Sequence, residues 1–146
     1  AVVTTLTPKA AQDMLDVLKE LEAMAAPLIC ENASDEEIAE ICQLHDKMLG
    51  FYATRSRLEY FKLNQQIHSR LISLAGNESL SLVYEILQTR MKRIRFIGDK
   101  KEDSWQAAVE DHDKIIEALK SRNGPRLSAA MVEHVTSSWE RIKRAL

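Results

Sequence analysis

Apolar residues recur at every third or fourth position along almost the whole sequence, and this spacing restricts the fold more than any other feature. It is the spacing of one α-helix face, whereas a half-buried β-strand would show strict alternation. No segment shows that alternation. Residue types that favour helices dominate, and only four glycines and three prolines occur. The pattern therefore predicts an all-α protein with long helices and few tight turns.

Start and stop signals delimit the first two helices. The Thr-Pro pair at 7–8 is a cap followed by a first-turn proline, and Pro27 is expected to kink or end that helix. Ser34 with Glu37 spells a capping box that opens the second helix. Gly50 is expected to close it. These signals predict helices from 8 to about 27 and from 35 to about 49.

The next two helices have similar signals. Ser56 with Glu59 repeats the capping-box spacing and opens the third helix, which Gly76 is expected to stop. Asn77 is expected to cap the fourth helix, whose apolar stripe runs to about Phe96. The third and fourth helices are therefore predicted to be joined by a short turn.

Two further helices complete the chain. A polar loop at 98–103 precedes Ser104, which is expected to cap the fifth helix, and the break at 123–125 precedes the sixth. Connections this short favour antiparallel neighbours rather than a solenoid. The length of 146 residues suits one domain. We therefore expect residues 1–146 to form a single antiparallel bundle of about six helices.

Charge and cysteine content argue against several classes of function. The formal net charge of −2 lacks the basic excess that nucleic-acid binding needs. Cys30 and Cys42 do not have the close spacing of a zinc or redox motif, so a reduced, cytoplasmic setting is expected. The longest apolar run is too short to span a membrane. Since the chain does not begin with Met, we expect a processed product or an excised domain.

Three of the four histidines interrupt apolar helix faces, and Asn64 lies four positions before the first of them. Residues four apart share a helix face, so Asn64 and His68 are expected to point the same way. His112 and His134 each share a face with apolar residues, which directs both rings into the protein. Three neutral imidazoles and one amide oxygen suit a divalent first-row metal and leave coordination positions for water or a ligand.

A plainer interpretation also fits this pattern, in which each histidine is a buried ring hydrogen-bonded to a carbonyl or carboxylate group. On these residues alone both interpretations stay open. His45 differs from the other three, because it lies between Leu44 and Asp46 on a flank expected to face solvent. We therefore assign His45 no role.

Several short motifs, read in order, resemble one known family. They are Lys19 with Glu22, YFKLNQQIHSRL at 60–71, AGN at 75–77, EDH at 110–112 and MVEH at 131–134. Their order and separation are similar to those of the FCD ligand-binding domain, which follows the winged helix in the FadR subfamily of GntR transcription regulators. The resemblance extends from about residue 12 to residue 139, and each motif is unremarkable alone.

The resemblance implies a metal at the floor of an effector pocket, with Asn64, His68, His112 and His134 as its ligands. We expect a divalent transition metal, zinc first, with nickel or iron as alternatives. The family more often has Asp at the first of these positions. Asn64 therefore removes one negative charge and a hard oxygen ligand, which lowers the expected metal affinity.

Small organic acids are the effectors that the resemblance implies, typically sugar acids, hydroxy acids or dicarboxylates. A metal with open positions can take a carboxylate while a nearby cation neutralises the remaining charge. Lys19, where the family often has an Arg that faces the effector, is the first candidate for that cation, and Arg90 is the second. The alternatives are a surface pair of Lys19 with Glu22 and a solvated basic helix end for Arg90.

Taken together, the resemblance implies a non-enzymatic, effector-sensing and dimerising domain of a bacterial transcription regulator. Such a homodimer would reach DNA only through a winged helix absent from this chain. Two alternatives stay open. One is a metal-dependent hydrolase-like enzyme, although the neighbouring carboxylates Glu110 and Glu133 are expected to face solvent. The other is a helical dimerisation module that binds no ligand.

Overall fold

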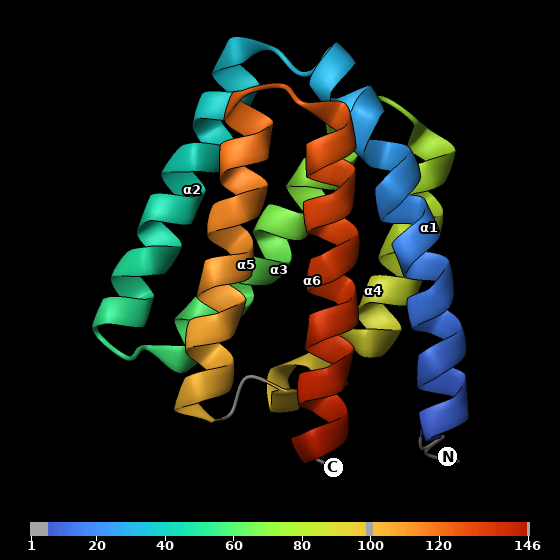
Figure 1. Cartoon of the computed structure of the whole chain (residues 1–146), viewed down its shortest axis with the longest axis vertical. Helices are drawn as coiled ribbons and strands as arrows, with labels where there is room; N and C mark the ends of the chain where they lie inside the picture. The colour runs from blue at the N-terminus through green and yellow to red at the C-terminus, as the bar shows by residue number, and fades with distance from the viewer. Residues whose placement is uncertain (1–5, 99–100, 146) are drawn as a thin grey trace.

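The computed structural model describes residues 6–98 and 101–145 (Figure 1), and all regular structure in these ranges is helical. The helices are α1 (Pro8–Asn32), α2 (Asp35–Ala53), α3 (Arg57–Ser73), α4 (Glu78–Gly98), α5 (Glu102–Lys120) and α6 (Gly124–Ala145). The all-α expectation is confirmed. Of the predicted loop at 98–103, residues 99 and 100 lie outside the described residues.

Successive helices run in opposite directions, and α2, α5, α6 and α1 form a row in front of α3 and α4 (Figure 1). Helix α6 packs against α1, α4 and α5, while α2 packs against α3 and α5. Side chains from five helices can therefore meet inside the bundle, among fully buried aliphatic residues such as Leu18, Leu71 and Leu127. Within the described ranges, no helix combines the length and apolarity that crossing a membrane requires.

Side-chain caps begin three helices as predicted. The Ser34 hydroxyl accepts a hydrogen bond from the Glu37 amide at 3.1 Å, and the Glu37 carboxylate accepts one from the Ser34 amide at 2.9 Å. Thr7 caps α1 and Asn77 caps α4 in the same way. Each cap and the amide that it satisfies are three residues apart, so short motifs are sufficient to specify these helix starts.

Helix α1 does not end at Pro27 but continues to Asn32. Proline has no N–H group to donate to the carbonyl of residue 23. The Ser128 hydroxyl of α6 donates to that carbonyl instead, at 3.4 Å. Gly124 also approaches so closely that an added Cβ would lie 3.2 Å from the Pro27 Cα. Tertiary packing against α6 therefore accommodates a proline that the sequence alone treats as a kink or an end.

Two other predicted boundaries and one predicted cap bond were wrong, although α3 begins directly after Ser56 as predicted. Helix α2 passes through Gly50 and ends at Ala53, just before Arg55 adopts a positive φ of 58°. Ser56 makes no cap bond to α3, because its hydroxyl pairs with the Thr54 hydroxyl at 2.8 Å. Helix α5 begins at Glu102, so Ser104 lies inside its first turn.

Candidate metal centre and effector cavity

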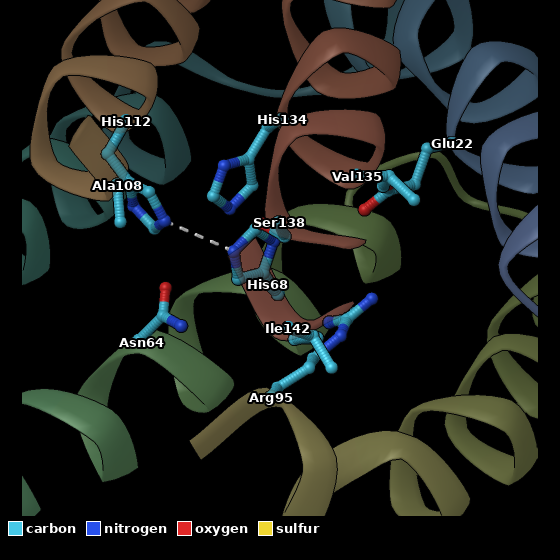
Figure 2. A pocket seen from close by; sticks show the side chains of 10 residues that line it. All are labelled: Glu22, Asn64, His68, Arg95, Ala108, His112, His134, Val135, Ser138 and Ile142. Atoms are coloured by element: carbon cyan, nitrogen blue, oxygen red, sulfur yellow. Dashed lines mark hydrogen bonds between the residues drawn. The ribbon is translucent and has the colours of Figure 1, made fainter. Parts of the chain in front are cut away.

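His68 from α3, His112 from α5 and His134 from α6 converge inside the bundle (Figure 2). The Nε2 atoms of His68 and His112 are 3.3 Å apart. One ring nitrogen from each of the three histidines lies within 4.8 Å of the other two. All three rings are buried. The structure thus brings together three side chains that the sequence analysis names as metal ligands.

The separation of these nitrogens fits a bound metal ion. Zinc binds imidazole nitrogen at about 2.0–2.1 Å in tetrahedral sites, which places neighbouring ligand nitrogens about 3.3 Å apart. The distance between the Nε2 atoms of His68 and His112 has this value. Neutral imidazoles also suit nickel and iron, so the donor set does not select one metal.

Asn64 lies one helical turn before His68, and its side chain extends toward the same space (Figure 2). Its Oδ1 atom is buried and has no hydrogen-bond partner among the described residues. Leaving a buried acceptor unsatisfied costs roughly 1–3 kcal/mol. A cation beside the histidines would satisfy this oxygen. The residues present therefore fit a metal ion, with Asn64 as a fourth donor.

His134 is oriented by a carboxylate on its far side. Its Nδ1 atom lies 3.0 Å from Asp111 Oδ2, to which Arg141 also donates at 3.1 Å. Burial raises the pKa of Asp111, but the hydrogen bond from His134 and the charge of Arg141 outweigh it, so the pKa lies below its ordinary value. Because an ionised carboxylate only accepts hydrogen bonds, Nδ1 carries the proton and Nε2 presents its lone pair to the cavity.

Asp111→Asn is expected to weaken metal binding by about 10- to 100-fold, the usual effect of removing a carboxylate that supports a ligating histidine. Asp113→Asn is a matched control on the same helix, since Asp113 contacts His45 rather than His134. Competition titration against a chromogenic chelator measures both affinities. Equal affinity of Asp111→Asn and the unaltered chain would contradict this role for Asp111.

His68 and His112 are held in their neutral forms. Burial lowers the pKa of each well below the ordinary value of 6.5. Metal ions bind the neutral imidazole, so protons compete with them only weakly at these two positions. The protonation states therefore suit a metal centre over the physiological pH range.

His45 does not face solvent, and that expectation was wrong. Its ring is 4% exposed and stacks on His112 with ring centroids 6.3 Å apart. Its Nε2 atom lies 2.9 Å from Asp113 Oδ1. The neighbouring Leu44 and Asp46 do not indicate that His45 is buried, because the side chain that contacts it, Asp113, lies on α5. His45 therefore packs behind His112 without belonging to the three-histidine cluster.

A small cavity lies beside the histidines. Besides the four predicted ligands, its lining consists of Glu22, Arg95, Ala108, Val135, Ser138 and Ile142. The enclosed space has a volume of about 20 Å³. A cavity of this size holds a metal ion or a water molecule, but not an organic acid. Any larger ligand must therefore widen it.

Arg95 supplies a positive charge to this lining, and its Nη1 atom donates to Gln88 Oε1 at 2.6 Å. The structure does not place Lys19 or Arg90 in the lining. Lys19 pairs with Asp16 at 3.6 Å on the outside of α1, and Arg90 is exposed on α4. Arg95, which was not predicted to line the cavity, thus lies five positions after Arg90, which was.

Glu22 does not pair with Lys19 on the surface, and that alternative was wrong. Its side chain is 2% exposed and lines the cavity, where the Tyr84 hydroxyl donates to Oε1 at 3.4 Å. Burial raises the pKa of Glu22 to about 7, although the charge of Arg95 and the Tyr84 hydrogen bond act in the opposite direction. Its position in the buried stripe with Leu18 was the available signal.

Comparison with known families and proteins gives consistent matches. The model of the FCD domain matches residues 13–137. The Bacillus subtilis strain 168 protein YdhC, described as an uncharacterised HTH-type transcriptional regulator, is 22% identical over 145 residues, covering 99% of this chain and 65% of the relative. The Nta operon transcriptional regulator of Aminobacter aminovorans is 28% identical over 135 residues, covering 89% and 60%. The chain thus spans less than two thirds of either relative.

Two solved structures share this fold. E. coli McbR/YncC superposes with a TM-score of 0.89 and 16% identity, covering 99% of this chain and 73% of the other. Streptococcus agalactiae GntR superposes with a TM-score of 0.76 and 18% identity, covering 89% and 58%. At these identities the likeness concerns the helical architecture alone.

Proposed function

This chain belongs to the FCD domain family, and from that premise we propose that it is the effector-sensing domain of a bacterial transcription regulator. In this proposal a small organic acid enters the cavity. The domain acts in the cytoplasm as a homodimer, and a separate winged-helix domain contacts DNA. The relatives regulate transcription, which favours a sensing role over a catalytic one.

The convergence of three histidines and Arg95 on one buried cavity carries the proposal. We assign metal coordination to Asn64, His68, His112 and His134, with zinc first and nickel or iron as alternatives. A bound divalent ion would supply a Lewis-acid position for a carboxylate oxygen. Arg95 adds a second positive group from another wall. Such a cavity is electrostatically suited to an organic anion.

The size of the cavity indicates how binding could be transmitted. An acid must widen a space of about 20 Å³ whose walls come from α1, α3, α4, α5 and α6. Close-packed helices shift rather than compress, so widening changes their relative positions. An effector that prefers one dimer arrangement by roughly 1–3 kcal/mol would change operator affinity about 5- to 150-fold.

Metal analysis combined with thermal unfolding tests the proposal. We expect about one equivalent of divalent metal per chain, and stabilisation by small carboxylates that disappears after chelation. At about one hundred times its dissociation constant, a carboxylate should add roughly 2.7 kcal/mol to the free energy of unfolding. For a domain of this size the melting temperature would rise by roughly 5–10 °C.

The other outcomes distinguish the alternatives. A chain without metal affinity that no carboxylate stabilises would be a dimerisation module. Metal-dependent turnover of esters, amides or lactones would indicate a hydrolase. Glu110 and Glu133 are both exposed, as predicted, and neither lines the cavity. They are therefore poorly placed to act as a general base there.

A further inference from the structure

Glu22 and Arg95 reach into the same buried space from α1 and α4 without forming an ion pair in the described structure (Figure 2). Arg95 donates to Gln88 instead. On Glu22 only Oε1 is engaged, by Tyr84, while Oε2 is buried and has no hydrogen-bond partner among the described residues. The cavity therefore contains a carboxyl oxygen that can accept a further hydrogen bond, as well as the positive groups that attract an anion.

An unused buried carboxyl oxygen restricts what can bind beside it. When ionised, Glu22 only accepts hydrogen bonds and repels a second carboxylate. A methyl group placed against it would leave Oε2 unsatisfied, which is unfavourable in a buried site. A hydroxyl or an ammonium group would instead satisfy the oxygen. Glu22 therefore discriminates between acids by the group at the end opposite their carboxylate.

Resting on the proposed function, we propose that the effector is an acid that also carries a hydrogen-bond donor, a hydroxyl or a protonated amine, which binds Glu22. The carboxylate of the effector lies at the histidine side of the cavity, and Arg95, which acts electrostatically on both His68 and Glu22, lies between the two groups. The donor lies against Glu22 Oε2, and Tyr84 holds the other carboxyl oxygen in place. Simple fatty acids and dicarboxylates are thereby excluded as preferred effectors.

Matched acids test this inference on the zinc-loaded chain at pH 8, above the pKa of about 7 that burial gives Glu22. One series is pentanoate, 5-hydroxypentanoate, 5-aminopentanoate and glutarate, and a second has one carbon fewer, so that two spacings are sampled. Titration calorimetry measures the dissociation constants. In at least one series, we expect the hydroxy or amino acid to bind about 10- to 100-fold more tightly than the methyl-terminated acid, the usual contribution of a hydrogen bond to a charged group. The dicarboxylate should bind most weakly.

Glu22→Gln separates this role from general packing. The glutamine keeps the size of the side chain and loses the charge, so the preference for the ammonium group should disappear and the dicarboxylate should gain affinity. Glu20→Gln is the matched control, because Glu20 is exposed on the same helix. Its acid preferences should equal those of the unaltered chain. Zinc content confirms that each variant retains an intact metal centre.

Two failures have different meanings. If acids bind but the terminal group makes no difference, or if Glu22→Gln changes the affinity of neither the amino acid nor the dicarboxylate, the role of Glu22 is wrong and the sensing function stands. If no acid in either series binds the zinc-loaded chain, both the sensing function and this inference are contradicted.

Discussion

His112→Ala is expected to lose the metal and, with it, all stabilisation by carboxylates. A zinc site with a full set of protein ligands contributes about 10–16 kcal/mol, so one ligand is worth roughly 3 kcal/mol. Its removal should weaken metal binding by about 100-fold or more. Elemental analysis of the purified variant and competition titration against a chelator measure this loss.

His45→Ala is the control for the loss of a buried ring. His45 and His112 are 4% and 3% exposed, and their rings stack on each other. Both variants should therefore lose folding stability in the presence of a chelator. Only His112→Ala should also lose metal, because His45 lies outside the three-histidine cluster. A metal content in His112→Ala equal to that of the unaltered chain would show that His112 is not a ligand.

The convergence of the histidines could be predicted because each helix turns its apolar face toward the core. His68, His112 and His134 interrupt such faces, and all three are buried together. Periodicity identifies the face that a residue occupies, but not the helices that cover it. His45 was misplaced for this reason, since its carboxylate partner Asp113 is 68 residues away in sequence.

Similar reasoning explains why Lys19 was predicted to face the effector and Arg95 was not. Lys19 is three residues before Glu22, which rotates it by about 60° around α1 relative to the side chain that lines the cavity. Arg95 lies in the last turn of α4, where a basic residue is also expected simply to complement the helix dipole. Its role depends on how α4 packs against α1 and α3, which no local pattern specifies.

The contrast between local and tertiary contacts also explains which helix boundaries were predicted correctly. The Ser34 and Glu37 capping box is local and could be read directly. Ser56 has an identical spacing to Glu59, yet its hydroxyl is engaged by Thr54. Pro27 stays helical because Ser128 of α6 satisfies the carbonyl that proline leaves without a donor. Signals three residues apart are therefore reliable only where no tertiary contact competes with them.

Glu22→Gln is expected to change how folding stability depends on pH. The pKa of Glu22 is about 7 in the folded chain, against 4.5 for a free glutamate. Between these values the folded state binds more protons at this group than the unfolded state does. The free energy of unfolding of the unaltered chain must therefore fall as pH rises through this window, by up to about 1.4 kcal/mol per pH unit. Glutamine does not titrate, so the variant lacks this loss.

Urea denaturation at pH 4 and pH 8, with a chelator present, measures the effect. Relative to the unaltered chain, Glu22→Gln should gain roughly 3 kcal/mol between the two pH values. His68 and His112 contribute the opposite trend, because their lowered pKa values make the folded state less stable as pH falls below 6.5. Both proteins contain these histidines, so their contribution cancels in the difference. Glu20→Gln, on the exposed side of α1, should show no such gain. A difference between Glu22→Gln and the unaltered chain that stays constant with pH would mean that the pKa of Glu22 is the same in the folded and unfolded chains, so that burial does not raise it.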